Sequence, residues 1–93
     1  MTQKDWTTDV AIGEGGLATE EAGVLAGDAS LRTFWSESNG MALVTVRSAG
    51  TQEWYTMSGS PVAAISEQDG LAVHEAAVEA AQRGDRATVS KSV

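Results

Sequence analysis

The sequence contains no cysteine, only one proline and five aromatic residues in a chain of 93. Without cysteine, the chain can form neither a disulfide framework nor a thiolate metal cluster. No apolar run approaches the roughly 20 residues that cross a bilayer, and residues 1–5 lack the apolar stretch of a signal peptide. We therefore expect a cytoplasmic protein with no metal site and no contact with a membrane.

Positive charge is also scarce. Six Lys and Arg residues stand against thirteen Asp and Glu residues, which gives a net charge of −7. Such a chain repels phosphate backbones, and its scattered cations form no stripe, so we expect no direct binding of nucleic acid. The acidic surplus favours solubility and is typical of proteins from salt-adapted, halophilic organisms.

The length and the hydrophobic pattern predict one small domain that spans residues 1–93. Residues 31–36, 41–47 and 51–57 are rich in β-branched and aromatic side chains, and turn signals at Asn39-Gly40 and Ala49-Gly50 separate them. These segments predict an antiparallel β-meander of three or more strands. With the helix described next, they indicate the α+β fold class.

One main C-terminal helix is predicted near residues 67–83. Ser66 is a typical N-cap with Asp69 three residues later, and Gly84 suits the position just after the last turn. At about 100° per residue, one side of this helix carries mainly small apolar residues, which suits close packing on the sheet. Residues 62–65 and 86–93 are candidates for short additional strands.

The N-terminal third has weaker signals. Alternation from Trp6 to Ile12 predicts a half-buried strand, and the glycines of residues 13–16 predict a flexible loop after it. Thr19, followed by two glutamates, is a candidate N-cap for a short helix that would end near Gly27.

The register of the meander determines the two faces of the sheet, because a shift of one residue reverses every side chain. With two-residue turns, Phe34 lies opposite Thr45, and Thr45 lies opposite Trp54. One face is then apolar and forms the core, with Leu31, Trp35, Ala42, Val44, Val46, Tyr55 and Met57. The other, which we call the mixed face, combines aromatic and polar side chains: Phe34, Leu43, Thr45, Arg47 and Trp54.

Two interpretations of the mixed face remain open. Tryptophan on a sheet surface is enriched at binding sites, because it offers a large contact area. Alternatively, the N-terminal segment with Trp6 and Ile12 folds over this face and creates a second core layer. We predict that Trp54 is at least partly exposed and belongs to a contact surface.

Catalytic chemistry has little support. The only histidine, His74, falls on the inward side of the predicted helix, and no nucleophile motif or ligand pair accompanies it. We expect no enzyme activity and no cofactor. The leading hypothesis is a small acidic interaction module that binds a protein partner or itself, as a homodimer, through the mixed face.

Two alternative hypotheses belong to other functional classes. An acidic inhibitor or nucleic-acid mimic would need carboxylates clustered on one surface, for which Glu75 with Glu79, Glu20 with Glu21, and Glu53 with Glu37 are the candidate pairs. A small ligand-binding protein or enzyme would instead use His74 with Glu53 or Tyr55, in a pocket between helix and sheet.

Overall fold

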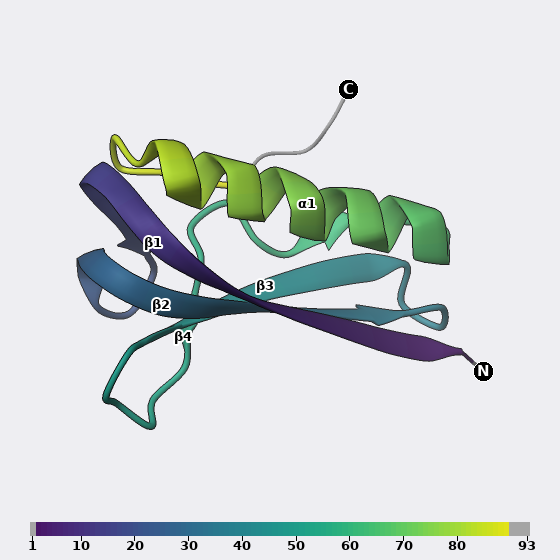
Figure 1. Cartoon of the computed structure of the whole chain (residues 1–93). Helices are drawn as coiled ribbons and strands as arrows, with labels where there is room; N and C mark the ends of the chain where they lie inside the picture. The colour runs from purple at the N-terminus through teal and green to yellow at the C-terminus, as the bar shows by residue number, and fades with distance from the viewer. Residues whose placement is uncertain (1, 90–93) are drawn as a thin grey trace.

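A computed structural model describes residues 2–89 of the chain. It has an antiparallel sheet with a single long helix lying along one face (Figure 1). The α+β prediction is therefore confirmed. In chain order the elements are β1 (Gln3–Thr19), β2 (Gly23–Ser36), β3 (Met41–Ser48), β4 (Tyr55–Thr56), β5 (Val62–Ala63) and α1 (Glu67–Arg83).

The sheet is a meander with the strand order β1-β2-β3-β4, and β5 pairs with β3 beside β4. The turn between β2 and β3 spans four residues rather than two, so Phe34 lies opposite Leu43 and not Thr45. In β4 it is Thr56 that lies opposite Thr45, while Trp54 precedes the strand. Both predicted registers are wrong by two residues. An even shift leaves each side chain on its predicted face.

The N-terminal third differs most from expectation. The predicted loop at residues 13–16 is an irregularity within β1, where the register with β2 shifts between Ile12 and Leu17. The predicted short helix is wrong, because its residues form the end of β1, a turn and the start of β2. The Thr19 hydroxyl caps this turn instead: it donates to the Gly23 carbonyl and accepts from the Ala22 N–H.

The core lies between the sheet and α1. The predicted core side chains of β2 and β3 are buried, with Met57, while Tyr55 is half-buried. The Ser66 hydroxyl accepts from the Asp69 N–H, as its capping role predicts, and the helix ends at Gly84. Small residues let the helix approach closely. A Cβ on Gly70 would lie 3.0 Å from the side chain of Trp35.

The C-terminal segment after α1 returns along β1. Its amides donate to the carbonyls of residues 14–16, and Ala87 forms an isolated bridge with Leu17. The expected last strand is thus one bridge within the described chain, and residues 90–93 of that prediction lie outside it. Thr19 bridges Met57, so the end of β1 also meets the chain that follows β4. Within residues 2–89, no helix has the length and apolarity needed to cross a membrane.

Candidate functional site

The mixed face is the side of the sheet opposite α1 (Figure 1). Residues alternate along β2 and β3, so Phe34 and Leu43 point away from the buried side chains beside them. Phe34 is 41% exposed, Leu43 36% and Trp54 37%. The alternative in which the N-terminal segment covers this face is wrong. That segment is β1, which extends the sheet beside β2 and directs Trp6 toward His74 on the helix side.

Arginines hold the exposed aromatic rings in place. The Arg32 guanidinium lies 4.7 Å from the centre of the Phe34 ring, and Arg47 lies 5.0 Å from the centre of the Trp54 ring. Cation–π contacts of this kind stabilise exposed sites by about 0.5–1 kcal/mol each. They also restrict the ring positions before any partner arrives.

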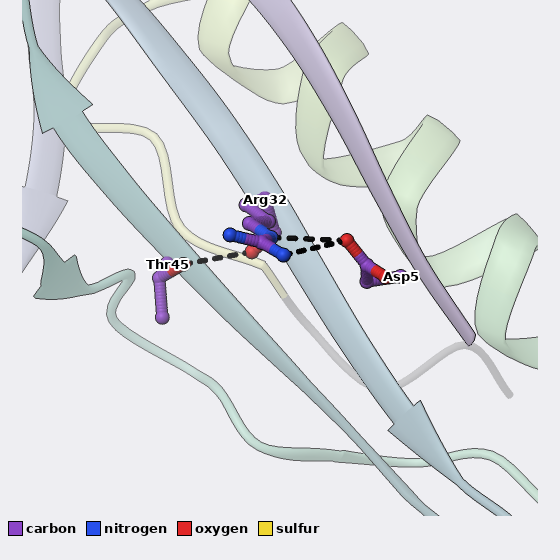
Figure 2. Close-up of polar contacts among 3 residues, drawn as sticks. All are labelled: Asp5, Arg32 and Thr45. Carbon is purple, nitrogen blue, oxygen red and sulfur yellow. Dashed lines mark hydrogen bonds and ion pairs between the residues drawn. The ribbon is translucent and has the colours of Figure 1, made fainter. Parts of the chain in front are cut away.

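A polar chain crosses the mixed face from β1 to β3 (Figure 2). The Asp5 carboxylate accepts from Arg32 at 3.0 Å from Nε and 2.9 Å from Nη2. The Thr45 hydroxyl donates to the backbone carbonyl of Arg32 at 2.9 Å. Arg32 is therefore fixed at both its side chain and its backbone, which in turn fixes its stacking on Phe34.

A groove opens beside these residues at the end of the sheet near the β2–β3 turn. Its volume is about 670 Å³. Aromatic, aliphatic and polar side chains share its lining, including Phe34, Leu43, Met41, Pro61 and Asp5. The structure thus places Phe34 and Leu43 toward the β2–β3 turn, Thr45 in the middle of β3, and Arg47 and Trp54 toward the β3–β4 loop.

His74 occupies a different environment, between the helix and the sheet. It is 3% exposed, and its ring nitrogens are each within hydrogen-bond distance of a threonine hydroxyl. Nδ1 lies 2.7 Å from Oγ1 of Thr33, and Nε2 lies 2.9 Å from Oγ1 of Thr8. Burial lowers the pKa of His74, and the charge of Glu75 opposes this only in part. A neutral imidazole, with one nitrogen donating and the other accepting, satisfies this arrangement.

The predicted companions of His74 lie elsewhere. The Tyr55 hydroxyl donates to Glu53 at 2.8 Å, and this contact raises the pKa of the tyrosine. The pairing of His74 with Glu53 or Tyr55 is therefore not formed, because both ring nitrogens already engage Thr8 and Thr33.

Several of the predicted acidic residues bond to neighbouring side chains, and the charges of Glu21 and Glu53 both act on Tyr55. Glu21 accepts from the hydroxyl and the N–H of Thr56, and these two bonds lower its pKa. Glu79 pairs with Arg83 on the helix. Glu53 and Glu37 lie beyond opposite ends of β3, so the structure separates this predicted pair. Among residues 2–89, no group of three His, Asp or Glu side chains is placed to hold a metal ion.

Asp5 and Arg32 are the members of this surface that the sequence analysis missed. Both belong to the outward side of the β1–β2 pair, where Asp5 alternates with Trp6. Extending the alternation of residues 6–12 back by one position would have found Asp5, but its pairing with β2 is a long-range property. No family model, no curated protein and no solved structure matches this chain, so its function has to be inferred from this geometry.

Proposed function

We propose that the protein is a non-enzymatic interaction module that binds another protein chain, a second copy or a different protein, through the mixed face. The observation that carries this proposal is the row of three large apolar side chains left exposed on the helix-free side of the sheet. Phe34, Leu43 and Trp54 are each more than a third exposed, although the chain contains few large apolar side chains with which to form a core.

The fixed positions of the aromatic rings in the free protein support the proposal. Trp, Tyr and Arg are the residues most enriched among those that dominate binding energy. Here Arg32 and Arg47 stack on the exposed rings in the free protein, so binding costs less side-chain entropy than it would for mobile rings.

The low net charge of the mixed face also supports the proposal. Among the strand residues that point to the mixed face, two arginines stand against three aspartates: Arg32, Arg47, Asp5, Asp9 and Asp28. This face therefore carries little of the net charge of −7. An acidic partner or a second copy can approach it with less repulsion than the rest of the surface would impose.

The other hypotheses receive less support. An enzyme or ligand-binding site built on His74 would need a free ring nitrogen facing solvent, whereas both nitrogens are occupied inside the core. An acidic mimic would need carboxylates concentrated on one surface, whereas the predicted pair Glu37 and Glu53 lies beyond opposite ends of β3, and an arginine pairs with Glu79.

The test compares Trp54→Ala with Leu71→Ala, a truncation on the helix at the same 37% exposure. Each immobilised variant is used to capture proteins from cells that produce this chain, and sedimentation records self-association in parallel. We expect Trp54→Ala to lose a species that the wild type and Leu71→Ala retain, with a loss of about 2 kcal/mol in binding.

Urea unfolding provides the control for folding. Trp54 precedes β4 and stacks on Arg47, so its removal should reduce the free energy of unfolding by only on the order of 1 kcal/mol. If Trp54→Ala binds as tightly as Leu71→Ala does, the mixed face is not the contact surface.

A further inference from the structure

The outer edge of β1, from Gln3 to Ala11, is an open strand edge. Glu37 donates its N–H to the carbonyl of Thr2, which places residue 2 in a hydrogen-bonded pair with β2. Such pairs alternate along an antiparallel ladder, so the odd-numbered residues direct their N–H and C=O groups away from β2. Within residues 2–89, no strand pairs with this stretch on its outer side.

The rest of the sheet perimeter is shorter, irregular or protected. Within the described part of the chain, residues 23–28 of β2 extend past the end of β3 and lack a partner strand on that side, but their pairing with β1 contains the register shift. On the far side, β4 and β5 have two residues each, and Pro61 stands between them. Short strands and proline are common ways to block pairing with another chain. Along β1 itself, residues 14–16 accept hydrogen bonds from the segment after α1. Among the edges formed by residues 2–89, the stretch from Gln3 to Ala11 is the longest that combines regular pairing with an uncovered side.

We propose that a second copy of this chain pairs with the outer edge of β1, antiparallel to it, about a two-fold axis at Trp6. This surface is distinct from the mixed face, so the inference goes beyond the function proposed above. Isologous pairing through one edge closes into a dimer and leaves the short, proline-protected far edges outside.

Charge selects between the possible registers, because like charges directly opposite one another destabilise a strand pair. An axis at Lys4, Asp5 or Asp9 would place that residue against itself. An axis at Thr7 would place Asp5 of one copy against Asp9 of the other. Of the positions from Lys4 to Asp9, only Trp6 and Thr8 bring no like charges together.

The axis at Thr8 is excluded because another segment of the chain covers the backbone that this register would need. That register would bring Thr2 of the second copy opposite Glu14, where the segment after α1 already occupies the outer side of β1: the N–H of Asp85 donates to the Glu14 carbonyl at 2.7 Å. The axis at Trp6 brings Thr2 opposite Val10, on the open edge. It places Asp5 opposite Thr7, and Gln3 opposite Asp9, so that each carboxylate faces a hydrogen-bond donor.

The resulting sheet is continuous from β4 of one copy to β4 of the other. The two helices lie on one side of it and the two mixed faces lie on the other. At the axis the half-buried Trp6 rings of the two copies meet on the helix side, which removes exposed aromatic surface from water.

Thr7→Asp tests the pairing. It sets a carboxylate opposite Asp5 of the second copy twice per dimer, while within its own chain it lies opposite Arg32, so the fold is retained. Ala76→Asp makes the same change of charge on the exposed side of α1. In sedimentation at about 100 μM protein, we expect a wild-type dimer whose Kd rises about tenfold in Thr7→Asp and is unchanged in Ala76→Asp.

A cysteine at the axis tests the register. Trp6 and its copy would form a non-hydrogen-bonded pair with Cα atoms about 4.5 Å apart, within the range of a disulfide. Because the chain has no cysteine of its own, Trp6→Cys should oxidise to a covalent dimer, while Lys4→Cys, displaced from the axis, should not. A monomeric wild type, a dimer that Thr7→Asp leaves intact, or equal cross-linking of both cysteine variants would overturn the proposal.

Discussion

Replacing Thr33 with valine should destabilise the fold through His74. Thr33 is 0% exposed, and its hydroxyl lies 2.7 Å from Nδ1 of the buried imidazole. Valine keeps the shape of the side chain but leaves Nδ1 without a partner where water has no access. An unsatisfied buried polar group costs about 1–3 kcal/mol of stability. Because both Thr33 and His74 are buried, we expect Thr33→Val to lower the free energy of unfolding by about 2 kcal/mol.

Thr8→Val is the matched control, because it removes the bond to the other ring nitrogen. Thr8 is only half-buried, so water can replace its hydroxyl at Nε2, and we expect a loss of about 1 kcal/mol or less. Urea unfolding of both variants at pH 7.5 measures the difference. If Thr33→Val is neutral, or if Thr8→Val costs more, the assignment of His74 as a satisfied structural residue is wrong.

Three further predictions concern His74 and the helix. Because burial holds the folded-state pKa of His74 below its ordinary 6.5, the unfolded chain gains a proton first. Stability should therefore fall as pH drops below about 6.5, by at most about 1.4 kcal/mol per pH unit, and urea unfolding of His74→Gln should lack this contribution. Gly70→Ala should destabilise by about 1 kcal/mol despite better helix propensity, because its Cβ meets Trp35, which a bond to Ala64 holds in place; a higher melting temperature would contradict this. Ser66→Ala should cost about 1 kcal/mol in thermal unfolding through the lost N-cap, and an unchanged melting temperature would refute that role.

The two faces of the sheet could be predicted from the sequence, because alternation is local and survives an even error in register. Phe34 and Leu43 stand on the exposed side although the turn before β3 has four residues and not two. The cap at Ser66 and the inward direction of His74 were predictable for the same reason, since each depends on residues close by in the chain.

The N-terminal third was not predictable in this way. Residues from Leu17 to Gly27 contain helix-forming residues and a plausible cap at Thr19, yet they form the end of β1, a turn and the start of β2. Pairing of Leu17 with Leu25 in β2 and with Ala87 near the other end of the chain outweighs the local preference. The contact of Thr8 and Thr33 with His74, and that of Asp5 with Arg32, depend on the same long-range pairing.

Photochemical cross-linking shows directly whether the mixed face contacts another protein chain. A photoreactive phenylalanine derivative is placed at position 34, or at position 71 on the helix, and the cells that produce the chain are irradiated. Both positions are exposed to a similar degree, so their reactivity toward random collisions is comparable. If the mixed face binds a protein chain, position 34 forms a discrete covalent adduct to that chain and position 71 forms none. A discrete adduct from position 71 alone, or equal yields from both positions, would contradict the proposed function.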